Sequence, residues 1–242
     1  MGAFGPGRTL GVISRSRQQL LTVIAIALTF GSGANDVAAF TRLGGVFTSV
    51  MTGNFVFFGL AVAERSLSLA GHTAVAIAGY IIGVAVATWV SYGFRKRSSP
   101  AAAVLPRHVS WVLLVELTLL AGGAIGWEIT DARPHGWASF ALLAVAAGAM
   151  GMQSAAVNEM GFSNFSTTFL TGTLTWLISS VARPGGDASG GVRRLGALIA
   201  LAAGACLSGL LVVDAVRFVP VLALAGVGTG LVLSRATVPG DD

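Results

Sequence analysis

The chain consists of long apolar runs separated by short polar or glycine-rich connections, and eight apolar segments can be delimited. A helix needs about 20 residues to span a hydrocarbon core of about 30 Å. Among the segments that contain a run of polar residues, the second and the sixth are the shortest. The pattern therefore predicts an all-α protein in which two helices are short. The segments are residues 20–41, 46–63, 72–94, 109–127, 137–158, 164–181, 195–213 and 218–234.

The positions of the basic residues test whether the two short segments cross the membrane, because cytoplasmic loops carry an excess of Lys and Arg. If all eight segments cross and the N-terminus is cytoplasmic, nine basic residues lie inside and six outside. If the second and sixth segments enter and leave by the same face, the division is eleven against four. We therefore expect six full spans plus two short or re-entrant helices, with both termini in the cytoplasm. Eight ordinary spans are the alternative.

Composition agrees with a polytopic membrane protein whose surroundings are the lipid bilayer. The mean hydropathy is +0.80, 54% of the residues are hydrophobic and 10% are charged, whereas a soluble domain has about 25% charged residues. The net charge of +5 comes from arginines clustered between apolar segments. We interpret these clusters as a topology signal and expect no nucleic-acid binding. The single cysteine, Cys206, excludes an internal disulfide and a multi-cysteine metal site.

The two halves of the chain resemble each other around the short segments. "TSVMTGN" at 48–54 aligns with "TTFLTGT" at 167–173, and the upstream alignment places Asp36 opposite Gln153. Each half contains an odd number of full spans, so the halves are expected to be inverted repeats, as in many transporters and channels. The expected organisation is a cytoplasmic tail at 1–18, a first repeat at 19–128, a connecting loop at 129–136, a second repeat at 137–234 and a C-terminal tail at 235–242.

The same motifs carry a resemblance to a known family. "DVAAFTRLGGVFTSVMTGN", followed by "GMQSAAVNEMG" and "STTFLTGTL", resembles the DUF1275 (YoaK-like) family of bacterial inner-membrane proteins. The resemblance covers nearly the whole chain, with Val37 as a departure where the family commonly has a small residue. It implies a small multi-pass protein of the bacterial inner (plasma) membrane and leaves its activity open.

Two acids lie inside apolar segments and are candidates for proton coupling. Asp36 lies sixteen residues past the start of the first segment, about 24 Å along a helix, and Glu116 lies near the middle of the fourth. A carboxyl group in the membrane interior is costly and is by default a functional candidate. The structural alternatives are helix capping by Asp36 and a hydrogen bond from Glu116 to a neighbouring helix. Arg42 is interpreted as an interface anchor, with pairing to Asp36 or to a substrate anion as the alternatives.

The sequence therefore favours a transmembrane transporter or channel for a small polar solute, coupled to protons through Asp36. Hydroxyl residues begin both short segments, and the positive end of a helix suits an anionic or carbonyl-bearing solute. The alternative is a membrane-embedded structural or signalling protein, such as a homo-oligomer assembled through small-residue faces. The candidate substrate-binding residues are Asp36, Thr48, Ser49, Thr52, Asn54, Gln153, Ser166, Thr167 and Thr171, and the candidate coupling residues are Asp36 and Glu116.

Enzymatic chemistry is not expected from this sequence. His72, His108 and His135 lie at segment edges without the spacing of a metal site. No serine has a nearby buried histidine that would serve as its base, and the glycine-rich stretches lack the Lys-Ser/Thr of a phosphate-binding loop. We therefore expect no enzyme activity, no cofactor and no metal.

Overall fold

The computed structural model describes residues 15–95, 104–160, 170–182 and 188–235, and within these ranges the chain is helical with no strand. The helices are α1 (Arg15–Arg42), α2 (Met51–Ala63), α3 (Leu67–Arg95), α4 (Arg107–Ile129), α5 (Trp137–Glu159), α6 (Leu170–Ala182), α7 (Ala188–Asp214), the 3-10 turn η1 (Val216–Phe218) and α8 (Val219–Ser234).

Six of the described helices are long and apolar enough to cross a membrane. α2 and α6 have 13 residues each, which corresponds to about 20 Å of helix, shorter than a hydrocarbon core of about 30 Å. The predicted all-α fold with six full spans and two short helices is thereby confirmed. Each short helix follows one of the two aligned polar motifs or contains part of it.

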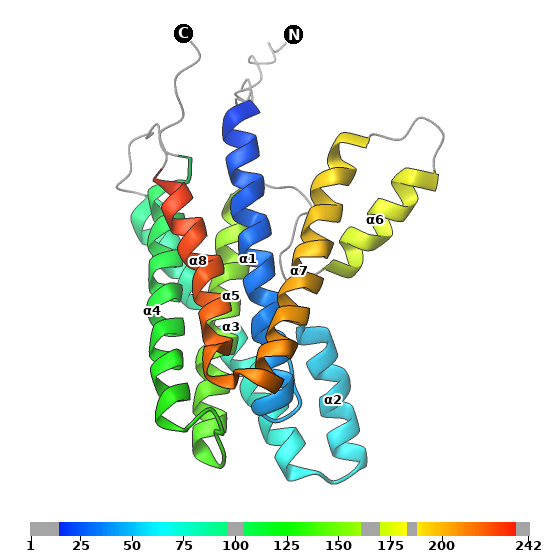
Figure 1. The fold of residues 1–242 in the computed structure, drawn as a ribbon, viewed down its shortest axis with the longest axis vertical. Coiled ribbons are helices and arrows are strands. Elements are labelled where there is room, and N and C mark those ends of the chain that lie inside the picture. Colours follow the sequence, from blue (N-terminus) through cyan, green and yellow to red (C-terminus); the bar gives the residue numbers. More distant parts are fainter. Residues whose placement is uncertain (1–14, 96–103, 161–169, 183–187, 236–242) are drawn as a thin grey trace, which may run out of the picture.

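The chain lies at the same end of the bundle before and after α2. In Figure 1, α1 runs to the lower end, α2 lies beside the lower half of the bundle, and α3 starts from the lower end again. Residues 43–50, which we call the entry loop, reverse the chain between α1 and α2. Gly44 and Gly45 have φ of +98° and +74°, a conformation that glycine adopts without strain. α2 is therefore a re-entrant helix, and α6 lies beside the upper half of the bundle (Figure 1).

The boundaries of the short helices differ from the expected ones. The second apolar segment was expected to begin at residue 46, but α2 begins at Met51. The reason is that the entry loop is apolar enough to extend the segment while its backbone is still turning. For the sixth segment, residues 164–169 lie outside the described ranges and α6 is described from Leu170.

The long helices pack around α1 and α5. α1 packs against α7 and α8, α5 packs against α3 and α4, and α4 and α8 also meet each other. The short helices are peripheral, with α2 on α3 and α6 on α7 (Figure 1). A cluster of buried aliphatic side chains joins α1, α4, α5 and α8.

Two of the helix crossings are backbone-to-backbone contacts that only glycine allows. A β-carbon on Gly83 of α3 would lie 2.0 Å from the carbonyl oxygen of Gly148 on α5, and one on Gly204 of α7 would lie 2.0 Å from that of Phe30 on α1. Small residues at such crossings allow helices to approach closely in lipid, where van der Waals packing drives association.

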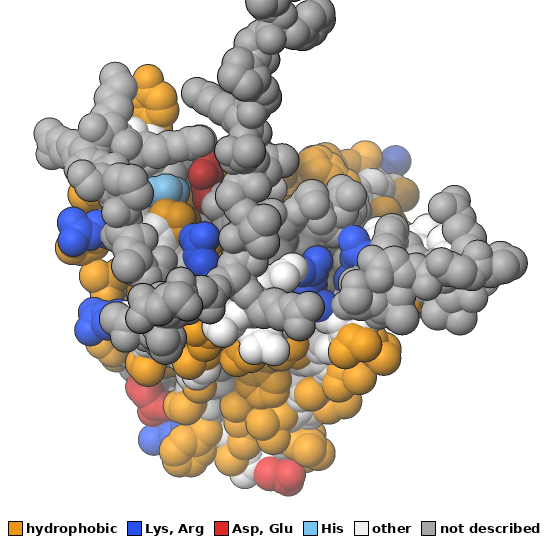
Figure 2. Space-filling view, turned by 90° about the horizontal axis from the view of Figure 1, so that it is seen from above, with side chains coloured by type: hydrophobic (Ala, Val, Ile, Leu, Met, Phe, Trp, Pro, Cys, Tyr) orange, Lys and Arg blue, Asp and Glu red, His pale blue; other side chains and the backbone are white. Residues whose placement is uncertain are grey.

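The two ends of the bundle differ in charge. The end at which α1 begins and α8 ends carries a gathering of Arg side chains (Figure 2). The opposite end carries basic and acidic groups together, and there Arg217 pairs with Asp131 at 3.0 Å and with Glu128 at 3.8 Å. The positive-inside rule predicts that the basic end faces the cytoplasm. The four arginines at the mixed end are Arg42, Arg65, Arg133 and Arg217, the same four that the re-entrant topology places outside.

Candidate functional site

Asp36 holds the entry loop against α1. The loop turns back along α1, so that two consecutive loop residues lie beside the carboxylate. The backbone N–H groups of Thr48 and Ser49 each donate to Oδ1 at 2.8 Å, the Thr48 hydroxyl donates to Oδ1 at 2.8 Å, and the Ser49 hydroxyl donates to Oδ2 at 2.5 Å. All three side chains are buried. Since α2 begins two residues after Ser49, the carboxylate lies near the positive end of that helix.

Asn54 closes the entry loop from the other side. It lies in the first turn of α2, is fully buried, and donates from Nδ2 to the Phe47 carbonyl at 2.7 Å while its Oδ1 accepts from the Phe47 N–H at 2.9 Å. The Phe47 ring forms a cluster with Phe40 of α1 and Phe57 of α2, at centroid distances of 5.3 and 5.8 Å, and those two rings lie 6.4 Å from each other. The polar residues of the first motif therefore satisfy the buried backbone of a non-helical segment.

Gln153 lies on α5 and reaches α1 one turn away from Asp36. Its Nε2 donates to the Ser32 hydroxyl at 2.7 Å and to the Leu28 carbonyl at 3.3 Å. Ser32 precedes Asp36 by four residues, so the two side chains lie on the same face of α1. Gln153 is fully buried, which makes this contact part of the bundle interior.

The structure brings some of the candidate residues together and leaves others apart. Asp36, Thr48, Ser49 and Asn54 form one buried cluster, and Gln153 lies near it through Ser32. Thr52 on α2 and Thr171 on α6 are exposed. Ser166 and Thr167 lie outside the described residues. Arg42 donates to the Val212 carbonyl at 3.2 Å, which agrees with its interpretation as an anchor near the bundle end.

Glu116 differs from Asp36 in having no hydrogen-bond partner among the described residues. Its side chain is fully buried in the middle of α4, and both carboxyl oxygens are without a partner. The neighbouring positions on the same face, Val112, Leu113 and Leu120, are buried and apolar. The alternative of a structural hydrogen bond to a neighbouring helix therefore has no described partner.

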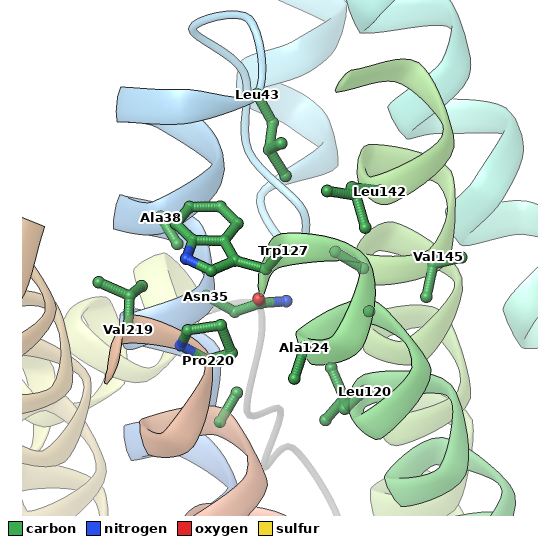
Figure 3. A pocket seen from close by; sticks show the side chains of 13 residues that line it. Asn35, Ala38, Leu43, Leu120, Ala124, Trp127, Leu142, Val145, Val219 and Pro220 are labelled. Atoms are coloured by element: carbon green, nitrogen blue, oxygen red, sulfur yellow. The ribbon is translucent and has the colours of Figure 1, made fainter. Parts of the chain in front are cut away.

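A cavity lies between α1, α4, α5 and α8, close to the entry loop (Figure 3). Two of the lining residues, Asn35 of α1 and Trp127 of α4, have side chains with polar groups. The indole N–H of Trp127 donates to the Val216 carbonyl at 3.0 Å. The Asn35 Nδ2 also approaches the Thr48 hydroxyl at 3.4 Å, which connects the cavity wall to the Asp36 cluster. The other lining residues are Ala38, Leu43, Leu120, Gly123, Ala124, Leu142, Val145, Ala146, Val219, Pro220 and Ala223.

Sequence reasoning missed Asn35, Ser32 and His72 as members of the buried polar network. Ser32 and Asn35 belong to the stretch "GSGAND" at 31–36, which ends at Asp36, so their position beside Asp36 was the available signal. His72 was interpreted as lying at a segment edge, yet it is buried, lies 3.2 Å from the Ser139 hydroxyl and stacks on Phe140. The expectation that no serine has a buried histidine nearby is therefore wrong at this pair, which packing of α3 against α5 brings together. A β-carbon on Gly44 would meet the His72 ring at 2.2 Å, so the turn of the entry loop rests on this ring.

Metal-ligand chemistry finds little support in the part of the chain that the structure describes. No group of three or more His, Cys, Asp or Glu side chains in these ranges is placed to hold a metal ion. His108 lies 3.7 Å from Glu159, and His135 is exposed.

Six long apolar helices, a re-entrant helix and a non-helical loop held by a buried aspartate define a multi-pass membrane protein with a structured membrane interior. The family model described as "Protein of unknown function (DUF1275)" matches residues 24–234, and the chain belongs to this family. The UPF0700 transmembrane protein YoaK of Bacillus subtilis (strain 168) is 28% identical over 167 residues, which cover 69% of this chain and 68% of YoaK. No solved structure matches the chain significantly. Family and fold together place the protein in the bacterial inner (plasma) membrane.

Proposed function

We propose that this protein is a transporter or channel for a small polar solute, built from two inverted repeats. The observation that carries the proposal is the entry loop, a non-helical segment whose Thr48 and Ser49 are held inside the bundle by Asp36. Non-helical backbone at membrane depth is tolerated where protein buries it or where it lines a wet cavity. Broken or half-length helices of this kind form the substrate sites of many secondary transporters.

The packing of the helices supports the repeat. The repeat makes four pairs of helices equivalent: α1 and α5, α2 and α6, α3 and α7, and α4 and α8. When the members of each pair are exchanged, every major helix contact becomes another contact that is also present. α1 against α7 becomes α5 against α3, and α2 against α3 becomes α6 against α7. In Figure 1 the chain runs in opposite directions through the exchanged helices, as an inverted repeat requires.

Matched glycine contacts give the repeat a register. A β-carbon on Gly33 would lie 2.2 Å from the Leu201 carbonyl oxygen, and one on Gly151 would lie 2.2 Å from that of Tyr80. Pairing Gly33 with Gly151 places Asn35 opposite Gln153, one residue away from the Asp36–Gln153 pairing expected from the sequence. The same register pairs Ser32 with Met150, and these two side chains meet at 3.6 Å, as equivalent residues beside a two-fold axis should.

The geometry also bears on the charge of the solute. The N–H groups of Thr48 and Ser49 ahead of α2 already donate to Asp36, so an anion at this helix start would have to compete with a carboxylate. A neutral polar solute that contacts the amides of Asn35 and Gln153 avoids this competition. An anionic solute, the option that the hydroxyl-led short helices suggested, needs a different helix end such as that of α6.

The alternative of a structural or signalling protein has two observations in its favour. The cavity beside the entry loop is lined mainly by apolar side chains, and the glycine crossings serve helix packing. A protein of this kind would bind no small polar solute, so the two proposals predict different results in a binding screen.

The proposal is tested by a thermal-stability screen of the purified protein against amino acids, short carboxylic acids, sugars and amines. A ligand at about 100 times its dissociation constant stabilises the folded state by about 2.7 kcal/mol. We expect at least one compound class to raise the melting temperature and to enter proteoliposomes faster than protein-free vesicles. Gln153→Leu should reduce this stabilisation, whereas Gln18→Leu on the exposed start of α1 should leave it unchanged. Absence of any stabilising compound would favour the structural alternative.

A further inference from the structure

The two acids inside the apolar helices have opposite surroundings. Asp36 accepts four hydrogen bonds from Thr48 and Ser49, so its oxygens are occupied in holding the entry loop. Glu116 is equally buried, yet no described group donates to or accepts from its carboxyl. The difference lies in geometry, because both acids belong to long apolar helices of the same bundle.

Glu116 lies near the middle of the apolar span formed by α4. It follows the start of α4 by nine residues and precedes its end by thirteen, which places it about 14 Å along the helix from Arg107. A charged carboxylate at that depth without a partner costs several kcal/mol, and such groups mark proton or ion pathways in membrane proteins.

The helices packed against α4 bring no described ion-pair partner to Glu116. α8 has no titratable side chain, and the one such group on α5 is Glu159, which lies near His108 at the end of α4. On α3, His72 is held by the Ser68 carbonyl and the Ser139 hydroxyl, and Tyr80 packs against the aliphatic core cluster. The remaining titratable groups of α3 and α4 lie toward the helix ends; they are Tyr92, Arg95, Arg107 and Glu128.

The cavity of Figure 3 runs along α4 to within one turn of Glu116. Trp127, Ala124 and Leu120 of α4 line it in that order, and Leu120 follows Glu116 by four residues on the same helix face. Leu120 is therefore the cavity-lining residue of α4 that lies nearest to Glu116 along the chain, and the cavity begins near the mixed-charge end of the bundle.

We infer that Glu116 is a proton-binding site of this protein, reached from the cavity past Leu120, and that Asp36 is a positioning residue for the entry loop. Glu116 holds its proton in the arrangement described and releases it when the cavity extends to it. The inference deepens the proposed function, since a proton-coupled transporter needs one group that is free to take up and release a proton. It does not depend on transport, because a proton can bind whether or not a solute crosses.

Infrared spectroscopy of the purified protein tests the site directly. A protonated carboxylic acid has a C=O stretching band that ionised carboxylates lack and that shifts on exchange into heavy water. We expect this band at neutral pH in the unmodified protein, its loss in Glu116→Gln, and its retention in Asp36→Asn and in Glu128→Gln at the exposed end of the same helix. Glu116→Asp should restore a band at a shifted position, which guards against a misfolded glutamine variant. A band that survives Glu116→Gln, or its absence from the unmodified protein, would overturn the inference.

The route is tested by two leucines on either side of Glu116. Leu120→Ala removes the side chain between the carboxyl and the cavity, so the band should respond faster to a pH jump or to heavy water. Leu113→Ala makes the same change three residues before Glu116, on the side away from the cavity lining, and should leave that rate unchanged. Equal acceleration in both variants would show that the proton reaches Glu116 by another path. Uptake of solute into proteoliposomes that contain these variants then tests the transport proposal separately.

Discussion

At the scale of single residues, Asp36 satisfies four donors in a segment that has no helix to satisfy them. Replacing it by alanine leaves the buried N–H groups of Thr48 and Ser49 without an acceptor. We expect Asp36→Ala to lower the free energy of unfolding by about 3 kcal/mol, since each unsatisfied buried donor costs about 1–3 kcal/mol. Asp36→Asn retains one carbonyl acceptor, so its loss should be about 1–2 kcal/mol. Unfolding of the purified protein in mixed micelles measures both values.

The control for this pair is Thr88→Val. Thr88 is exposed on α3 and donates only to the Val84 carbonyl of its own helix, so its replacement should change stability by less than either Asp36 variant. If Asp36→Ala is as stable as Thr88→Val, the carboxylate does not hold the entry loop.

At the scale of helices, the crossings of α3 with α5 and of α7 with α1 depend on missing side chains. Gly83→Ala and Gly204→Ala place a β-carbon 2.0 Å from a facing carbonyl oxygen, which forces the helices apart. Overpacking of this kind costs about 1–3 kcal/mol, and each variant should lose that much stability. Gly93→Ala on α3 and Gly209→Ala on α7 meet nothing within 4 Å, so they should be neutral or slightly stabilising because alanine favours the helix.

The same comparison tests the repeat. If the two crossings are equivalent, Gly83→Ala and Gly204→Ala should cost similar amounts, and the double variant should cost about their sum because the sites share no partner. A large loss at one glycine and none at the other would mean that the two crossings are not equivalent.

The elements that the sequence predicted well are those set by hydrophobic length. The six spans and the two short helices follow from runs of apolar residues, which lipid requires of any helix that crosses it. The start of α2 was placed at residue 46 instead of Met51, because hydropathy does not distinguish an apolar loop from a helix. The reversal at Gly44 and Gly45 depends on backbone dihedrals, and those become visible only in the folded chain.

The sequence predicted part of the candidate site, namely the residues that lie close together along the chain. Asp36, Thr48 and Ser49 were grouped in one candidate site from the sequence, and the hydroxyls of Thr48 and Ser49 do donate to the carboxylate. Asn35 and Trp127 were missed because a cavity between four helices depends on which helix faces meet. The roles of Asn54, which binds its own loop, and Thr52, which is exposed, depend on the direction in which α2 leaves the entry loop.

At the scale of the whole molecule, the positions of the basic residues and the re-entrant path of α2 predict a single orientation of the protein in the membrane. The turn between α2 and α3 should face the periplasm or cell exterior, and the segment between α3 and α4 should face the cytoplasm. An ordinary eight-span protein with a cytoplasmic N-terminus has both assignments reversed. The topology therefore separates the re-entrant architecture from its alternative without knowledge of the solute.

The re-entrant architecture is tested most directly by labelling single cysteines from either side of the membrane. Cys206 is first replaced by alanine, and Ser68→Cys, exposed at the start of α3, and Ser98→Cys, between α3 and α4, are then introduced separately. An impermeant thiol reagent added to intact cells should label Ser68→Cys and leave Ser98→Cys unlabelled until the membrane is opened. Labelling of Ser98→Cys from outside with protection of Ser68→Cys would contradict the re-entrant helix and support eight full spans.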